Sequence, residues 1–270
     1  MIKLMRGDCE IRLQELPDSC VDLVVTSPPY DALRRYKGVE EPWNFDKFKR
    51  VAKQLHRVLK PGAVIVWVVG DSTVNGSEST SSFRQDIFFT ELGLNLHDTM
   101  IYAKNNPIPQ NHNRYEQCFE YMFVLSKGKP KTFNGLTEPT KLAGQTMDWG
   151  NRKTVMDLNQ CRRHRGTELI KVKDTKLRKN IFWYSIGGGK TGHPAVFPLQ
   201  LATDHILSWS NPGDIVLDPF MGSGTTGVSA ISYSRGFIGI ELSQEYYRSS
   251  KRRIREAAHE AKDRHNEACK

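Results

Sequence analysis

The feature that most constrains this chain is an apolar run, Val21–Thr26, that leads directly into a pair of prolines. A run of this kind is typical of a strand that is buried on both faces of a parallel sheet. Pro28 and Pro29 lack N–H groups, so they end the strand in a stiff turn whose carbonyls have no partner in the sheet. The chain must therefore hold a rigid turn, rich in acceptors, at the carboxyl end of a core strand.

This turn carries groups that suit a flat ligand with an exocyclic amino group. The Ser27 hydroxyl and the Pro28 carbonyl can accept hydrogen bonds from an NH₂ group, and the Tyr30 ring can stack on the ligand. A proline turn that only ends a core strand would have the same sequence. The motif alone therefore leaves the function open.

A second motif of strand and turn lies near the C-terminus. The strand predicted at Asp214–Asp218 is followed by a glycine-rich stretch, Pro219–Gly227, that leads into a helix. This arrangement points backbone N–H groups and a positive helix end at a ligand. The glycines satisfy the G-x-G-x-x-G fingerprint, and Glu241 follows the first of them by roughly twenty residues, as a ribose-binding acid would. The fingerprint does not choose between NAD, FAD and S-adenosylmethionine.

Between these motifs the apolar pattern alternates between strands and helices, which predicts an α/β fold with a parallel sheet. Helices are expected around Phe48–Leu59, Leu199–Leu207 and Ser243–His265. The predicted strands are Val21–Thr26, Val64–Gly70, Asp98–Ala103, Tyr121–Ser126, Asp214–Asp218 and Phe237–Glu241.

Composition bounds the class of protein. A chain of 270 residues can bury one substantial α/β core, and its net charge of +9 and pI near 9.3 suit a protein that meets a polyanion. No signal peptide and no apolar run long enough to cross a bilayer are visible, so a cytoplasmic protein without a membrane partner is expected. The five cysteines have no CxxC spacing, which favours reduced thiols and no zinc site.

Together the two motifs resemble those of the DNA amino-methyltransferases, which methylate N4 of cytosine or N6 of adenine. In that family Ser/Asn/Asp-Pro-Pro-Tyr/Phe/Trp is catalytic and Asp-Pro-Phe-x-Gly-Ser-Gly-Thr binds the methyl donor, and here these stand at Ser27–Tyr30 and Asp218–Thr225. The catalytic motif comes first, which is the permuted order of the family's beta group. Three further stretches are similar to family segments: Leu59–Val66, Arg114–Gly128 and His193–Pro198.

The resemblance implies a Rossmann-like, doubly wound, mostly parallel methyltransferase sheet with a small basic insertion. It divides the chain into a catalytic half (1–130), a target-recognition insertion (131–180) and a half that binds S-adenosylmethionine (181–270). The implied catalytic residues are Ser27, Pro28, Pro29 and Tyr30. The implied donor-binding residues are Asp8, Thr26, His193, Pro194, Asp218, Pro219, Phe220, Gly222, Ser223, Gly224, Thr225 and Glu241.

The segment Lys131–Asn180 holds 12 Lys and Arg against 5 Asp and Glu, so it carries +7 of the net charge of +9. In the resembled family this region recognises the target. Lysine and arginine neutralise phosphates and read base edges, which makes Arg162, Arg163 and Arg165 the expected contacts with double-stranded DNA. A basic loop without a partner is the alternative. A cognate restriction endonuclease is a candidate partner, and a monomer and a homodimer both remain open.

The chemistry favours one base. The Ser27 hydroxyl can donate to N3 of cytosine or accept from its N4 amine, whereas a carboxylate at that position would only accept. We therefore expect transfer to N4 of a flipped-out cytosine, with adenine N6 as the alternative. Other hypotheses are a catalytically inactive module that binds S-adenosylmethionine and DNA, a nicotinamide oxidoreductase, and an RNA or protein methyltransferase.

Overall fold

The computed structural model describes residues 1–29, 43–107, 113–148, 169–185 and 198–268. These residues separate into two compact units, one made of Met1–Asn134 with Asn180–Lys270 and the other of Gly135–Lys179. None of the described helices has the length and apolar character that crossing a bilayer requires.

The described part of the larger unit is built on an eight-stranded sheet. Strand β7 runs antiparallel to both of its neighbours, and every other pair of neighbouring strands is parallel. In spatial order the strands are β1 (Ile2–Arg6), β14 (Gly236–Glu241), β13 (Ile215–Asp218), β2 (Val21–Thr26), β3 (Leu59–Val69), β7 (Phe119–Ser126), β6 (Asn95–Lys104) and β12 (Ile181–Tyr184).

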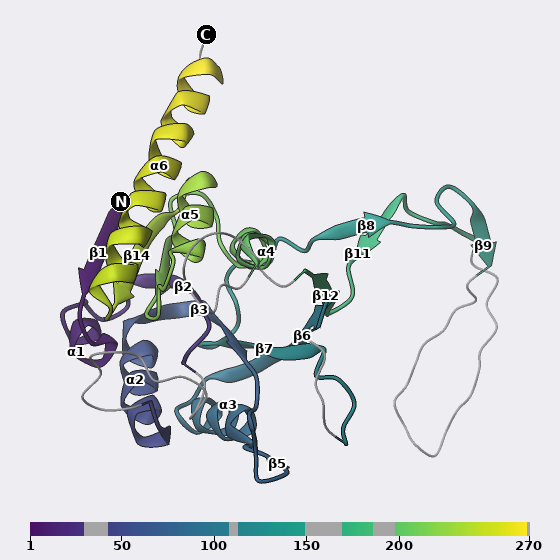
Figure 1. The fold of residues 1–270 in the computed structure, drawn as a ribbon. Coiled ribbons are helices and arrows are strands. Elements are labelled where there is room, and N and C mark those ends of the chain that lie inside the picture. The colour runs from purple at the N-terminus through teal and green to yellow at the C-terminus, as the bar shows by residue number, and fades with distance from the viewer. Residues whose placement is uncertain (30–42, 108–112, 149–168, 186–197, 269–270) are drawn as a thin grey trace. The chain divides into compact units, whose positions relative to one another are not determined.

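Helices cover both faces of this sheet (Figure 1). One face packs against α1 (Cys9–Gln14), α2 (Phe45–Val58) and α3 (Ser81–Glu91), and the other against α4 (Leu199–Trp209), α5 (Thr225–Ser232) and α6 (Gln244–Ala268). Because both faces are covered, all residues of β2 are buried, which explains its unbroken apolar sequence. A short hairpin of β4 (Thr73–Val74) and β5 (Ser77–Glu78) precedes α3.

Helix α2 follows from its sequence. Asn44 caps it by accepting a hydrogen bond from the Lys47 N–H at 2.9 Å. Phe48, Val51 and Leu55, at helical spacing, are fully buried against the sheet. Burial of three such side chains contributes roughly 5–9 kcal/mol to folding before the entropy of ordering the chain is subtracted.

The connections around β2 and β13 wind in opposite directions. From β2 the chain crosses through α2 to β3 on one side, and from β13 it crosses through α5 to β14 on the other. The strand order therefore reverses between β2 and β13, which are direct neighbours. In open α/β sheets, ligands bind outside the carboxyl ends of the strands at such a switch point.

The smaller unit contains two antiparallel strand pairs. Strand β8 (Thr137–Pro139) pairs with β11 (Thr175–Leu177), and β9 (Thr146–Asp148) pairs with β10 (Leu169–Lys171). Most of its described side chains are exposed. The smaller unit is shorter than the predicted insertion 131–180, since Lys131 belongs to the larger unit. There its ammonium lies 2.5 Å from an Asp22 carboxylate oxygen.

The predicted fold class, a mostly parallel doubly wound sheet, is confirmed. All six predicted strands are present, but β3 begins at Leu59, because Leu59 pairs with Val21 across a register shift. Strands β1 and β12 were not predicted. Both lie at the edges of the sheet, and in both buried and exposed side chains are mixed, so neither has a continuous apolar run.

Candidate active site at the switch point

The two motifs singled out in the sequence meet at one edge of the sheet. Strands β2 and β13 are parallel neighbours, paired at Leu23 with Val216 and at Val24 with Leu217. The turn Ser27–Pro29, which follows β2, and the loop Pro219–Gly224, which follows β13, therefore leave the sheet side by side at its carboxyl edge. The structure brings together groups that are about 190 residues apart in the chain.

A buried hydrogen bond joins the two strand ends. The Thr26 hydroxyl donates to Oδ1 of Asp218 at 2.6 Å, and these residues are 0% and 1% exposed. The Thr226 hydroxyl, in the first turn of α5, donates to the Val25 carbonyl at 3.3 Å. Both contacts connect the end of β2, which leads into the turn Ser27–Pro29, to the side of the glycine loop.

Asp218 is fixed from several directions. Its Oδ1 also accepts from the Phe220 N–H at 3.1 Å, so one oxygen holds both the end of β2 and the start of the loop. Burial raises the pKa of Asp218 to about 6, and the hydrogen bonds from Thr26 and Phe220 oppose that shift. A carboxylate so enclosed orients the loop around it. Its direct contact with a donor stays a prediction.

The loop needs its glycines. Gly224 has a φ of 82° and immediately precedes α5, in a conformation that disfavours side chains. A Cβ on Gly224 would lie 2.9 Å from the Ser250 Cβ of α6, and a Cβ on Gly227 would lie 2.5 Å from the Phe237 ring. The glycine pattern therefore permits a tight turn and close packing of α5 against α6 and β14.

Glu241, at the end of β14, faces the same loop. Its carboxylate accepts from the Gly222 N–H at 2.8 Å and from the Ser243 N–H at 2.7 Å. Burial raises the pKa of Glu241, while those two N–H groups act in the opposite direction. Each carboxylate oxygen has a second lone pair. Glu241 can therefore order the loop and still accept hydroxyl groups of a ligand.

Asp8 continues this row of acids one strand further, after β1. Its carboxylate caps α1 by accepting from the Glu10 N–H at 2.9 Å, and it pairs with the Lys47 ammonium at 2.6 Å. The preceding residue, Gly7, donates its N–H to the Glu241 carbonyl at 3.0 Å. These contacts give Asp8 a structural role, and its place beside a donor stays a prediction.

Two residues beside the loop were not predicted. The Trp43 ring lies edge-on against the Phe220 ring, with centroids 5.0 Å apart, and no hydrogen-bond partner of its buried Nε1 is found among the described residues. Arg253 of α6 donates from Nη1 to the Ser223 carbonyl. Trp43 has a local signal, because it is an aromatic residue directly before Asn44, the cap of α2. Arg253 has none, because it lies in a charged helix whose sequence predicts only a solvated face.

Further polar groups gather along the same carboxyl edge. After β3, the Asp71 carboxylate accepts from the Ser79 hydroxyl at 2.9 Å and from the Ser82 N–H at 3.1 Å. Across β6 and β7, the Lys104 ammonium lies 2.8 Å from a Glu120 carboxylate oxygen. The edge that holds the two motifs thus carries further hydrogen-bonded polar groups.

The predicted site residues fall partly inside and partly outside the described residues. Tyr30, His193, Pro194, Arg162, Arg163 and Arg165 lie outside the described residues. Of the predicted catalytic turn, Ser27 and Pro29 are partly exposed and Pro28 is buried. No group of three or more His, Cys, Asp or Glu side chains that could hold a metal ion occurs in the part of the chain that is described.

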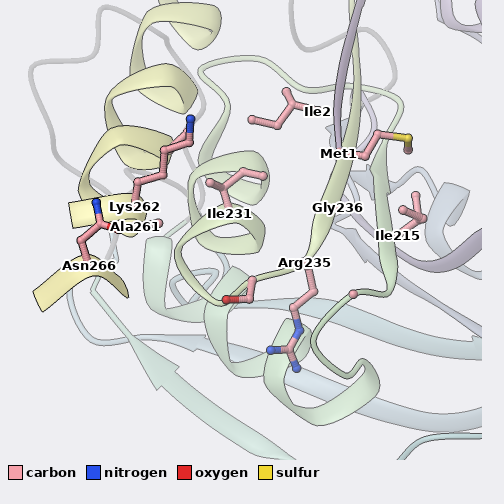
Figure 2. Close-up of a pocket in the computed structure, with 12 residues that line it drawn as sticks. Met1, Ile2, Ile215, Ile231, Arg235, Gly236, Ala261, Lys262 and Asn266 are labelled. Atoms are coloured by element: carbon pink, nitrogen blue, oxygen red, sulfur yellow. The ribbon is translucent and has the colours of Figure 1, made fainter. Parts of the chain in front are cut away.

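A pocket of about 500 Å³ lies at the opposite edge of the sheet. It is lined by the first residues of β1, β13 and β14, among them Ile2, Ile215 and Gly236, and by Ala261 and Lys262 of α6 (Figure 2). Because the strands are parallel, their starts and their carboxyl ends lie on opposite edges. This pocket is therefore separate from the site at the switch point.

Comparison with known proteins identifies the family to which the chain is similar. Residues 21–252 match the DNA methylase family (N6_N4_Mtase). The chain is 49% identical over 247 residues to the orphan methyltransferase M.BamHII of Bacillus amyloliquefaciens, covering 86% of this chain and 88% of that protein. It is 29% identical to the type II methyltransferase M.HinfI of Haemophilus influenzae, covering 94% of this chain and 68% of that protein.

Solved structures match over nearly the whole chain. The M1.HpyAVI–SAM complex superposes with a TM-score of 0.64 at 28% identity, covering 94% of this chain and 99% of that one. The cytosine-N4-specific PvuII DNA methyltransferase superposes with a TM-score of 0.66 at 20% identity, covering 96% of this chain and 92% of that one. At 20% identity, the similarity to the PvuII enzyme supports the fold alone.

Proposed function

This chain belongs to the DNA methylase family, and from that premise we propose that it transfers a methyl group from S-adenosylmethionine to the exocyclic N4 of cytosine in duplex DNA. The observation that carries the proposal is the hydrogen bond of 2.6 Å between Thr26 and Asp218. It holds the amine-accepting turn and the glycine loop at one switch point. A group-transfer enzyme needs both of its substrates at such a place.

The residues around the loop fit the proposed donor. Tightly packed glycines let the backbone approach a ligand closely, and Glu241 retains lone pairs for the ribose hydroxyls. The Phe220 ring supplies an aromatic face near which a sulfonium cation is favourable. When bound, S-adenosylmethionine supplies an electrophilic methyl group. M1.HpyAVI was solved with the same donor.

The catalytic turn handles the nucleophile. The amine of cytosine is a weak nucleophile because its lone pair is delocalised into the ring. By accepting hydrogen bonds from the amine, the Ser27 hydroxyl and the Pro28 carbonyl draw the nitrogen toward tetrahedral geometry and free its lone pair. The base must leave the duplex to reach the turn, and Tyr30 stacks on the extruded ring. S-adenosylhomocysteine is the leaving group, and the nitrogen loses one of its two protons to solvent during or after the transfer.

Ser27 favours cytosine over adenine. A neutral hydroxyl can donate to cytosine N3 as well as accept from N4, whereas a carboxylate at this position would face the acceptor edge of the base and repel it. Adenine N6 remains the alternative, since the matched family takes its label from both positions. The order of the motifs supports a place in the family's beta group.

Duplex DNA is the proposed partner of the basic segment 131–180, with Arg162, Arg163 and Arg165 as contacts. Within this segment, the exposed lysines Lys171 and Lys173 lie in the smaller unit. A cognate restriction endonuclease is a further candidate partner.

The test uses the full chain, duplex DNA of mixed sequence and S-adenosylmethionine with a labelled methyl group. After digestion to nucleosides, chromatography with mass spectrometry should find the label in N4-methylcytosine. Label in N6-methyladenine would replace the proposed base with its alternative. Donor and DNA binding without transfer would identify an inactive recognition module, and binding of NAD in place of the donor would identify an oxidoreductase.

A further inference from the structure

We infer that Thr26 is a positioning residue: its hydroxyl acts on the donor loop through Asp218 and so sets the distance between the donor and the base. This inference rests on the proposed methyl transfer. It gives Thr26 a different role from that of a donor-binding residue, since Thr26 is fully buried and its hydroxyl is directed at Asp218.

Thr26 lies at the end of β2, where its side chain contacts the end of β13. Thr26 is the last residue of β2, and the next residue, Ser27, is the first acceptor of the catalytic turn. Asp218 is likewise the last residue of β13 and leads directly into the glycine loop. The contact of 2.6 Å therefore joins two strand ends at the points where both reactive segments begin.

A single oxygen of Asp218 links the position of Thr26 to that of the glycine loop. Oδ1 of Asp218 accepts from the Thr26 hydroxyl and from the Phe220 N–H, so a shift of the carboxylate moves the first residues of the loop. The Phe220 ring is in turn packed edge-on against Trp43 and Trp67, with centroids 5.0 and 6.1 Å away. Trp67 in turn pairs with Thr26 across β2 and β3, so the Phe220 ring packs against a direct neighbour of Thr26 in the sheet.

Sheet pairing alone holds the two strands less firmly at this end. The ladder between β2 and β13 is recorded at Leu23 with Val216 and at Val24 with Leu217, and the strand ends beyond it are joined by side chains. Methyl transfer requires the two reacting atoms within a few tenths of an ångström of the productive geometry. A misplacement of about 1 Å costs up to 10²-fold in rate.

Thr26→Val removes the hydroxyl and keeps the shape of the side chain. We expect single-turnover methyl transfer at saturating donor and DNA to fall by about 10–100-fold, because the loop is released from the catalytic turn. The dissociation constant of the donor should change by less than about threefold, because Glu241 and the glycine loop remain. Thr26→Ser, which keeps the hydroxyl, should restore the rate to within about threefold of wild type.

Thr203→Val is the matched control. Thr203 is also buried, at 6% exposure, and its hydroxyl shares a hydrogen bond of 2.9 Å with Ser229, between α4 and α5. Its loss should lower the melting temperature without lowering the transfer rate of the folded protein. If Thr26→Val does not fold, Thr26→Cys replaces it, since a thiol is a weaker donor of similar size and should give an intermediate rate.

The outcomes separate this inference from the function on which it rests. Loss of rate in Thr26→Val with rescue by Thr26→Ser and near-normal donor affinity supports it. An active wild type with an unchanged Thr26→Val rate, or a donor affinity that falls by the same factor as the rate, would overturn the inference alone. A wild-type protein that transfers no methyl group would overturn the function, and this inference with it.

Discussion

Polar side chains are buried and hydrogen-bonded at the switch-point site, whereas most of those in the smaller unit are exposed to solvent. At the switch point, Thr26 and Asp218 are buried and joined by a short hydrogen bond, and Glu241 accepts from two backbone N–H groups. In the smaller unit, Lys171 and Lys173 are exposed, and the pair of Lys176 with Glu138 at 3.2 Å is open to solvent on both sides. Group transfer requires fixed geometry, whereas a basic surface keeps its charge available to a partner.

Desolvation explains the difference in energetics. A carboxylate removed from water is destabilised unless donors surround it, which is why the pKa of Asp218 rises to about 6 even with its hydrogen bonds. Exposed lysines keep their hydration, and their effect depends on salt. The two regions should therefore respond to different perturbations: the first to removal of single atoms and to pH, the second to ionic strength.

The largest effect is expected at the proposed catalytic turn, Ser27–Pro29. Ser27→Ala removes one acceptor of the amine and should slow single-turnover methyl transfer by about 10²–10³-fold. Donor affinity should stay within about twofold, as measured by calorimetry, because the glycine loop is intact. Ser229→Ala, at a buried hydroxyl between α4 and α5, is the control. Equal loss of transfer and donor binding in Ser27→Ala would assign Ser27 to folding.

The second prediction uses the acidity of Asp218. Its pKa lies above the ordinary value of 3.8, at about 6, so the folded protein holds a proton more tightly than the unfolded chain. The resulting stabilisation is complete below about pH 4 and is lost as the pH rises through about 6. The shift corresponds to at most about 3 kcal/mol at 1.4 kcal/mol per unit. Glu241, whose pKa is also raised, contributes with the same sign.

Urea denaturation of the donor-free protein between pH 4 and pH 7 checks this sign. Other carboxylates also make the free energy of unfolding depend on pH. The quantity to compare is therefore the difference in that free energy between wild type and Asp218→Asn. That difference should change by about 1–3 kcal/mol across the range, because the variant cannot titrate at this position. A difference that does not vary with pH would show that Asp218 is not the titrating group.

The features that the sequence predicts best are those with local signals. The end of β2 was predictable because an apolar run meets two prolines, and the loop after β13 because its glycines follow a short apolar strand. Glu241 was predictable from its spacing after Gly222, and the two contact each other at 2.8 Å. In each case neighbouring residues in the chain determine the local structure.

Other contacts depend on the tertiary fold and leave no local trace. The hydrogen bond from Thr26 to Asp218 requires that β2 and β13 be neighbours, which follows from strand order. Arg253 reaches the Ser223 carbonyl only because α6 packs on α5, and Trp43 meets Phe220 only in the folded protein. Exact partners across elements come from topology, which periodicity does not specify.

A third and smaller effect is expected at Glu241, the proposed ribose-binding acid. Glu241→Gln keeps the shape of the side chain and one acceptor oxygen but replaces the other by a donor, which meets a backbone N–H. Loss of one charge-assisted hydrogen bond predicts donor binding about tenfold weaker or more. Glu260→Gln, on an exposed turn of α6 with a side chain 70% exposed, is the matched control. Normal donor affinity in Glu241→Gln would place the ribose elsewhere.

The smallest effect should appear in the salt dependence of DNA binding. Arg162→Ala with Arg163→Ala removes two positive charges from the basic segment, and each lost phosphate contact lowers the slope of log K against log salt by about 1. Arg252→Ala, on α6 with a side chain 74% exposed, should leave the slope unchanged if α6 is a solvated face. Fluorescence anisotropy at several salt concentrations measures both slopes. Equal slopes for wild type and the double variant would show that these arginines do not contact DNA. A lower slope for Arg252→Ala would add α6 to the DNA interface. DNA recognition would then involve the same helix whose Arg253 donates to the Ser223 carbonyl.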